Sequence, residues 1–339
     1  MSYEYTKFIP QNIAPYDTKK IVVYKDGVRY LSVRLKGLRY EPKKKLYSVG
    51  YLADIHEMAN GMTVAPYSSV KLDNALTWFE EQGVTDVFIA GDITNHGFWN
   101  SDGTKDLTQF AEFKRIVDKH PNINVYVIGG NHDSYFKAIT ETEADWKTYT
   151  GCDLHYVVEK GNDLFIMVSQ PNSTTPMSED AFAMLKTTLQ NSNGKRCFIV
   201  VHPFLSGDSG NALNVYGSRM FDSWSHTTEL KTLLSQHNAM ILHGHSHIKF
   251  DYQDQEDSAN YTEKNGFHSM HIPSTTTPAD IVDGERVQST VESYGYIMDA
   301  YSDCVVFRAR NFGTYQNGAM VNSKWIPIAT YKIDMAEVS

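Results

Sequence analysis

The sequence has few cysteines, no long apolar run and no large cluster of basic residues. Its three cysteines, Cys152, Cys197 and Cys304, are widely spaced and form no CxxC pair, so we expect buried thiols rather than a disulfide framework. No apolar run approaches the ~20 residues that a membrane span needs. The first ten residues carry no apolar segment typical of a secretion signal. These absences predict a cytoplasmic protein without a membrane span.

Positive charge is also scarce. The formal net charge is -9, and the one lysine run is residues 43–45. Binding to duplex nucleic acid through phosphate neutralisation is therefore not expected. An acidic protein can still act on phosphate groups if bound cations supply the positive charge.

The composition of the 339-residue chain, with 41% hydrophobic and 21% charged residues, is that of a globular protein. Residues 19–35 contain two β-rich runs around Asp26-Gly27, a hairpin signal. We therefore expect residues 1–45 to form a small N-terminal β extension. Residues 46–339 are predicted to form the main α/β domain.

Apolar strands alternate with amphipathic helices from residue 46 onward. We predict strands within 46–56, 86–92 and 124–133, and helices over 69–83 and 107–120. Such a β-α-β-α-β order implies a largely parallel sheet buried on both faces. Each strand runs into polar residues, and ligands of open α/β sheets bind at the carboxyl ends of strands.

The second half of the chain has a more mixed order. It predicts two strands within 146–170, strands at 195–204 and 239–247, helices at 178–192 and 227–238, and antiparallel strands over 266–339. Residues 205–225 lack periodicity, as functional or disordered loops do. We interpret them as a lid-like substrate loop, in which Tyr216 and Arg219 are candidates to stack a base or grip a phosphate. A surface loop with its own small cluster is the alternative.

Five polar motifs each follow a predicted strand: DIH (54–56), GD (91–92), GNHD (130–133), VHP (201–203) and GHSH (244–247). Each motif alone is compatible with an ordinary turn or a packed histidine. Together, carboxylate, imidazole and amide groups form a set that suits Mn, Fe, Zn or Ni. Side chains two apart in a strand share a face. If strand geometry persists past the strand end, His245 and His247 address one metal centre or two adjacent ones.

This series of motifs resembles the calcineurin-like metallophosphoesterase superfamily, over about residues 46–275. The resemblance implies a four-layer α/β/β/α sandwich of two mixed sheets, with a dinuclear metal site at the carboxyl ends of the strands. It implies one metal held by Asp54, His56, Asp92 and His247, a second held by Asp92, Asn131, His202 and His245, a catalytic His132 beside the scissile phosphate, and Asp133 orienting that histidine.

The activity implied by the resemblance is hydrolysis of a small phosphoester. Two divalent ions, manganese first and iron, zinc or nickel as alternatives, would hold the phosphoryl oxygens and a bridging hydroxide that attacks phosphorus. His132 would serve as general acid or electrostatic stabiliser of the leaving group.

Departures within residues 91–97 narrow the subfamily. His96 stands where protein phosphatases of this superfamily carry an arginine, and Asn95 stands where purple acid phosphatases carry a ligand tyrosine. The pattern looks most like class III cyclic-nucleotide phosphodiesterases of bacteria. We therefore expect a phosphodiesterase for a small diester or nucleotide. Asn95 and His96 are candidate substrate contacts, although His96 could instead cap the following helix.

Two alternative functions stay open on the sequence. One is a phosphomonoesterase or pyrophosphatase. The other is a phosphodiesterase of cell-wall polymers, carried as a component of a surface or phage-tail-like assembly, with the N-terminal extension serving attachment.

Overall fold

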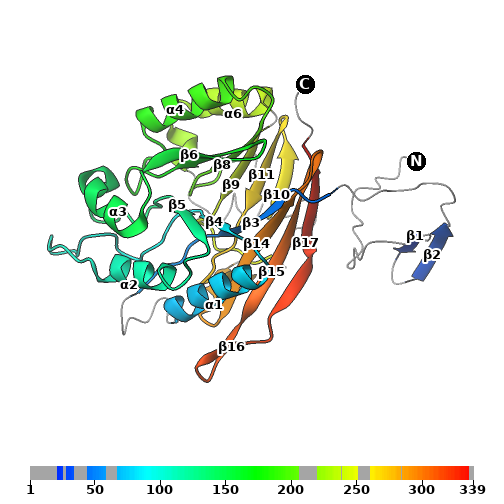
Figure 1. The fold of residues 1–339 in the computed structure, drawn as a ribbon, viewed down its shortest axis with the longest axis horizontal. Coiled ribbons are helices and arrows are strands. Elements are labelled where there is room, and N and C mark those ends of the chain that lie inside the picture. The colour runs from blue at the N-terminus through cyan, green and yellow to red at the C-terminus, as the bar shows by residue number, and fades with distance from the viewer. Residues whose placement is uncertain are drawn as a thin grey trace.

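The computed structural model describes residues 21–25, 28–33, 44–58, 67–205, 220–237, 239–250, 260–283 and 285–335. Near the N-terminus, β1 (Ile21–Lys25) and β2 (Val28–Val33) pair antiparallel, with Ile21 opposite Val33. This pairing is the hairpin that the sequence predicts. The main body consists of two mixed sheets with helices on their outer faces (Figure 1).

The first sheet contains the three strands predicted after residue 46. Its path is β16-β15-β14-β3-β4-β5, and β17 pairs with β15. Strands β3, β4 and β5 run parallel, as predicted, and β14 is antiparallel to β3. The bounds are β3 Tyr47–Leu52, β4 Asp86–Ile89, β5 Asn124–Val127, β14 Glu292–Ala300, β15 Cys304–Gln316, β16 Ala319–Val321 and β17 Lys324–Asp334.

The second sheet has the order β10-β11-β9-β8-β7-β6. The bounds are β6 His155–Lys160, β7 Asp163–Val168, β8 Arg196–Val200, β9 Met240–His243, β10 Tyr261–Lys264 and β11 Phe267–His271. The prediction of antiparallel strands beyond residue 266 is wrong for β11. This strand is antiparallel to β10 but parallel to β9, with Met270 opposite Leu242. The pairing with β10 follows from the short turn between these two strands. The pairing with β9 cannot be predicted in this way, because a long crossover connects β9 to β11.

Helices cover both outer faces, which completes the four-layer α/β/β/α sandwich. Helices α1 (Ser68–Glu81), α2 (Thr108–Val117) and α3 (Glu143–Thr150) pack on the first sheet, and α4 (Glu179–Gln190) and α6 (Thr227–Gln236) pack on the second. Short 3-10 helices span Ile139–Thr142 and Met220–Ser223. Among the described residues, no helix has the length and apolarity required to span a membrane.

The two strands predicted within residues 146–170 are β6 and β7, and they follow α3, a helix that the sequence does not predict. Trp146 is fully buried and packs edge-on against Phe110 of α2, with ring centroids 5.8 Å apart. Tyr149 adds ring contacts with Phe98 and Phe110 at 6.4 Å. Trp146 and Tyr149 together hold a helix of eight residues that has no clear apolar period. In contrast, Ser178 caps α4 as a serine in this position should, because its Oγ accepts the Ala181 N–H at 3.2 Å.

An aromatic stack joins the two sheets. The ring of Phe88 on β4 lies 5.6 Å from Tyr51 on β3 and 4.4 Å from Phe165 on β7, and Phe165 lies 5.2 Å from Phe198 on β8. All four side chains are fully buried, and stacked rings at these distances stabilise a core beyond area burial alone. The stack packs the sheets so that the loops after β3, β4, β5, β8 and β9 meet at one end.

Candidate metal centre and cavity

Two groups of potential metal ligands meet at that end of the sheets. One ligand atom from each of Asp54, His56, Asp92 and His247 lies within 4.8 Å of every other, and the same holds for Asp92, His202 and His245. Asp92 belongs to both groups. The side-chain Oδ1 of Asn131 lies 3.0 Å from Nε2 of His202 and so adjoins the second group. The structure therefore brings together all seven residues that the resemblance selects.

Five of these residues have an unusual backbone conformation. Asp54, His56, Asp92, His245 and His247 all have positive φ, between 46° and 73°. This left-handed region is uncommon for residues other than glycine, and such strain clusters at functional sites. Strand β9 ends before His245 and His247, so the alternation of a strand does not orient them. Left-handed turns do so instead.

Three glycines of the motifs allow the loops to approach the ligand side chains. A Cβ at Gly130 would lie 2.2 Å from Oδ1 of Asp92, and one at Gly244 would lie 2.6 Å from Oδ2 of Asp54. A Cβ at Gly91 would lie 2.6 Å from Nδ1 of His202. Glycine is therefore required at these three positions, because a larger side chain would collide with the ligand side chains.

Hydrogen bonds to carbonyl groups determine which imidazole nitrogens carry hydrogen. His202 Nδ1 lies 2.8 Å from the Ala90 oxygen, and His247 Nδ1 lies 3.0 Å from the Thr277 oxygen. A carbonyl only accepts, so both Nδ1 atoms donate, and each ring, when neutral, presents a lone pair on Nε2. Partners of this kind orient metal-bound histidines. Nε2 of His247 lies 3.1 Å from Nε2 of His56 and 3.2 Å from Oδ1 of Asp54, a convergence of donors that fits a divalent cation.

For three of the ligands, His56, His245 and Asp92, the electrostatics of the site favour the protonation state that metal binding requires. Burial lowers the pKa of His56 and of His245 well below the usual range. Burial also opposes ionisation of Asp92, but nearby imidazoles, His202 first, hold its pKa well below the ordinary value. Burial acts to lower the pKa of His202, yet the Asp92 carboxylate raises it to about 9. The two groups thus contain an ionised shared carboxylate and neutral His56 and His245, whereas His202 pairs with that carboxylate and holds a proton that a cation would displace.

His132 lies beside the two groups and belongs to neither of them. Its Nδ1 lies 2.9 Å from the Asn95 carbonyl oxygen, and its backbone N–H donates to Oδ1 of Asp92 at 2.8 Å. The ring meets that of His56 edge-on, with centroids 4.6 Å apart. The Asn95 carbonyl fixes the ring through Nδ1, which leaves Nε2 for contacts in the cavity.

Asp133 does not orient His132 as the resemblance implies. Its buried carboxylate accepts the N–H groups of Ile93, Thr94 and Gly130 at 2.8 to 3.1 Å and the Thr94 hydroxyl at 2.9 Å. Burial, followed by the nearby Asp92, raises the pKa of Asp133 to about 6. Asp133 therefore joins the loops after β4 and β5, and the ring of His132 takes its partner from Asn95 instead.

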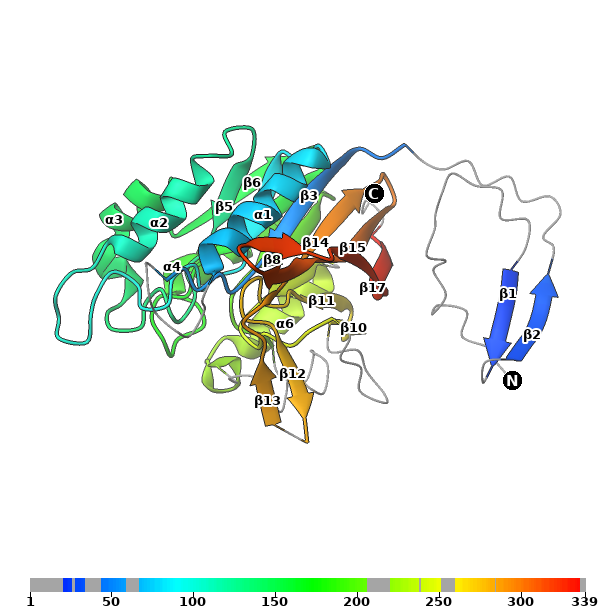
Figure 2. The same cartoon turned by 90° about the horizontal axis from the view of Figure 1, so that it is seen from below.

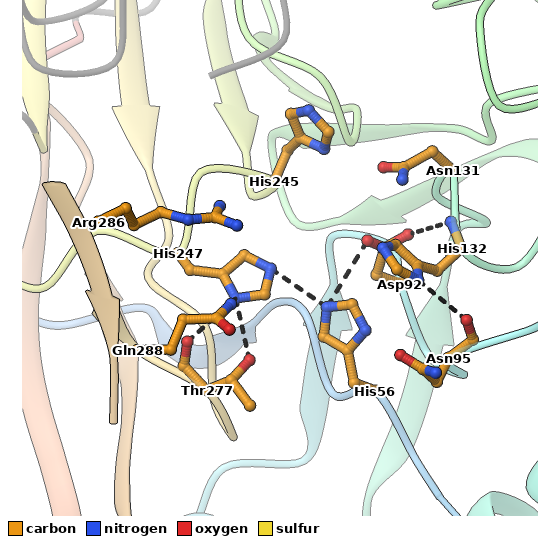
Figure 3. A pocket seen from close by; sticks show the side chains of 10 residues that line it. All are labelled: His56, Asp92, Asn95, Asn131, His132, His245, His247, Thr277, Arg286 and Gln288. Atoms are coloured by element: carbon orange, nitrogen blue, oxygen red, sulfur yellow. Dashed lines mark hydrogen bonds and ion pairs between the residues drawn. The ribbon is translucent and has the colours of Figure 1, made fainter. Parts of the chain in front are cut away.

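A cavity of about 560 Å3 opens over the two groups. Its lining consists of His56, Asp92, Asn95, Asn131, His132, His245, His247, Thr277, Arg286 and Gln288 (Figure 3). The sequence prediction did not include the last three. Arg286 and Gln288 come from a hairpin of β12 (Ala279–Val282) and β13 (Glu285–Gln288). No motif marks them, because their place depends entirely on how this hairpin packs.

The predicted substrate residues have different locations. Asn95 lines the cavity, whereas His96 is absent from its lining. Nδ1 of His96 lies 3.2 Å from Nε2 of Gln109 on α2, and its ring is nearly parallel to that of Phe136 at 6.0 Å. Tyr216 and Arg219 of the predicted lid lie outside the described residues, as does all of 206–219.

Solved structures share this fold at low sequence identity. A dimetal phosphatase from Danio rerio is 14% identical with a TM-score of 0.56, and the match covers 86% of this chain and all of that one. The purple acid phosphatase PPD1 from yellow lupin seeds is 13% identical with a TM-score of 0.55, over 83% of this chain and 53% of the lupin chain. GAP50, the anchor in the inner membrane complex of Plasmodium, is 12% identical with a TM-score of 0.54, over 86% and 90% of the two chains.

Comparison of the sequence itself also identifies a family. No curated protein matches the chain. The model of the calcineurin-like phosphoesterase family matches residues 47–249, which is more than half of the chain and includes every motif described above. With the two groups of metal ligands in place, the protein belongs to the calcineurin-like phosphoesterase family and is a metal-dependent phosphoester hydrolase.

Proposed function

We propose that the protein is a phosphodiesterase that uses two divalent cations, with residues 46–339 as its catalytic domain. The observation that carries the proposal is the position of Asp92, which belongs to both ligand groups beneath one cavity. The first cation is assigned to Asp54, His56, Asp92 and His247, and the second to Asp92, Asn131, His202 and His245. Manganese is the preferred ion, with iron, zinc or nickel as alternatives for this mixed nitrogen and oxygen set.

Two cations held by these residues would supply positive charge to the phosphoryl oxygens and would lower the pKa of a coordinated water. The protein contributes fixed geometry. The Ala90 and Thr277 carbonyls hold the rings of His202 and His247, and Asp133 holds the loops after β4 and β5 together. Ligands that are already in place do not have to reorganise during the reaction.

His132 is the proposed general acid. The Asn95 carbonyl holds Nδ1, and the protonated ring donates from Nε2 to the oxygen that leaves phosphorus. A departing alkoxide requires a proton or a positive charge beside it. Because His132 lies outside both ligand groups, its loss should reduce the rate without removing metal.

The shape of the cavity supports a diester over a monoester. Asn95 and His132 lie on one side of the ring of His56, and Arg286 and Gln288 lie on the other (Figure 3). A phosphorus atom above the two ligand groups therefore has room for a substituent on each side. A diester has two such substituents, whereas a monoester has one.

The proposal is tested with bis-p-nitrophenyl phosphate and p-nitrophenyl phosphate, with each of Mn, Fe, Zn and Ni added to metal-free protein. We expect a higher kcat/KM for the diester. A higher kcat/KM for the monoester would support the monoesterase alternative. Silence of folded, metal-loaded protein toward both esters would overturn the enzymatic proposal.

A further inference from the structure

The β12–β13 hairpin forms a second wall of the cavity. Figure 2 shows it standing away from the two main sheets. Gln288 pairs with Ala279 and Arg286 with Ile281. Since side chains alternate along a strand, Arg286 and Gln288 share the face that lines the cavity, and Glu285 and Val287 lie on the other. All four residues of β13 are exposed, so this wall is accessible to a ligand.

The base of the hairpin is firmly attached to the domain. The Ala279 N–H donates to the His247 oxygen at 2.7 Å, and the Lys249 N–H donates to the Ala279 oxygen at 2.9 Å. The side chain of Lys249 pairs with Asp280 at 2.7 Å and with Glu292. The hairpin is thus joined directly to the segment that carries His247, which fixes its distance from the metal ligands.

A buried lysine connects the two ends of the hairpin. Nζ of Lys71 on α1 donates to the carbonyl of Thr276, before β12, and to that of Thr290, after β13, the latter at 2.7 Å. The side chain of Lys71 is fully buried. An exposed hairpin held in this way presents its side chains from a fixed base, which lowers the entropy cost of binding a ligand.

Arg286 is the one residue with a permanent positive charge among the ten that line the cavity. Within the part of the chain that the structure describes, its hydrogen bond goes to the Ser246 oxygen at the long distance of 3.4 Å, and no carboxylate pairs with it. The carboxylate of Asp280 on the neighbouring strand β12 lies opposite Val287 and is engaged by Lys249. A guanidinium has five N–H donors in a planar fork that matches phosphate and carboxylate groups, so most of these donors are available to a ligand.

The position of Arg286 indicates which part of a substrate it would contact. The side chain points from the hairpin toward His247 and His245, on the side of the cavity opposite His132 (Figure 3). With His132 beside the leaving group, the substituent that remains on phosphorus extends toward Arg286. The amide of Gln288, 3.3 Å from Nδ1 of His247, lies next to the same substituent.

We propose that Arg286, assisted by Gln288, forms a subsite for a second anionic group of the substrate, a phosphate or carboxylate on the substituent that does not leave. This inference rests on the proposed function. It narrows the substrate class to phosphodiesters that carry an additional negative charge. The metal ligands act on the scissile phosphate, and Arg286 selects the substituent.

The test uses a matched pair of p-nitrophenyl esters of thymidine 5′-phosphate, one with a free 3′-hydroxyl and one with a 3′-phosphate. We expect wild-type kcat/KM to be higher for the 3′-phosphorylated ester. In Arg286→Gln this ratio should fall about 10- to 100-fold, the cost of one charge-assisted hydrogen-bonding contact. Arg286→Lys should retain part of the preference. Glu285→Gln, on the opposite face of the same strand, is the control and should leave the ratio unchanged.

A binding measurement tests, without any turnover, whether Arg286 binds a second anionic group. Calorimetry should show tighter binding of thymidine 3′,5′-bisphosphate than of thymidine 5′-phosphate to metal-loaded wild type, and Arg286→Gln should remove the difference. Equal affinities in the wild type, or a preference that survives in Arg286→Gln, would overturn the inference. Absence of hydrolysis of every ester by the wild type would instead count against the proposed function, while the affinities still decide the subsite.

Discussion

The two walls of the cavity are built in different ways. The wall that carries the motifs consists of loops at strand ends, with buried side chains, left-handed backbone and carbonyl partners for its imidazoles. The wall formed by β12 and β13 is a regular, exposed hairpin, where Arg286 has one long hydrogen bond within the described chain. The difference suggests a division of labour, in which rigid loops hold the reacting groups and an accessible hairpin selects the substrate.

The largest effect on the motif wall is expected from Asp92→Asn. An amide in place of this carboxylate removes the negative charge that both ligand groups share. We expect loss of metal and a fall in kcat of more than about 100-fold. Mutation of a residue that only hydrogen-bonds a metal ligand can already cost about 100-fold, and Asp92 is itself a proposed ligand. Metal content by mass spectrometry and turnover measure the two effects. Asp118→Asn, at an exposed position of the same residue type, is the control. Full metal content in Asp92→Asn would contradict the shared-ligand assignment.

His132→Ala should separate the reaction from metal binding. The ring lies next to both ligand groups but outside them, so the variant should bind metal as the wild type does. Its kcat should fall by about 10²- to 10⁴-fold, the range for loss of a general acid. Metal content measured beside turnover checks this pair of outcomes. If the variant loses metal, His132 is a ligand and the assignment of roles is wrong.

Gly130→Ala tests how closely the motif wall is packed. The added Cβ would meet Oδ1 of Asp92 at 2.2 Å, so the carboxylate must move. We expect metal affinity to fall about 10- to 100-fold, measured by titration of metal-free protein. Gly103→Ala is the comparison, because no atom lies within 4 Å of the new Cβ there, and its positive φ of 81° adds backbone strain that Gly130 does not have. An equal loss of affinity in both variants would point to general destabilisation.

The smallest effect concerns the attachment of the hairpin wall and depends on pH. Burial, partly offset by Glu292, lowers the pKa of Lys71 to about 7. From about pH 7 up to the usual lysine range, the unfolded chain keeps a proton that the folded chain has released. The free energy of unfolding of the wild type should therefore rise with pH relative to Lys71→Met, by at most about 1.4 kcal/mol per pH unit.

Urea unfolding of both proteins between pH 7 and 9.5 measures this difference. Lys114→Met is the control, because Lys114 is an exposed lysine that pairs with Asp118. The difference in free energy of unfolding between this variant and the wild type should not rise with pH in the same way. A constant difference between the wild type and Lys71→Met across this range would show that Lys71 stays protonated when buried.

Much of the ligand set could be predicted because each motif is local. A strand, a turn and a polar residue such as Asp54 or Asp92 are neighbours in the chain, and an apolar strand predicts where the turn begins. The parallel pairing of β3, β4 and β5 follows from the helices between them. In contrast, α3 depends on contacts of Trp146 and Tyr149 with a neighbouring helix, and the parallel pairing of β11 depends on a distant strand. Neither leaves a periodic pattern.

The role of Asp133 could not be predicted for a related reason. Asp133 follows His132 in the sequence and was expected to orient its ring, but side chains of adjacent residues point in different directions. The carboxylate of Asp133 instead accepts backbone N–H groups some 40 residues earlier in the chain. The carbonyl that holds His132 belongs to Asn95, and the identity of a residue says nothing about the position of its carbonyl.

The sequence by itself determined the α/β class, the parallel strands and the residues able to bind metal, because these depend on periodicity and on chemistry carried within short segments. Only the tertiary structure decided that Asp133 holds backbone N–H groups of two loops, that Gly130 and Gly244 pack directly against ligand carboxylates, and that Arg286 lies across the cavity from His132. Those relations depend on how two sheets and a hairpin pack in space, and packing joins residues that no local pattern connects.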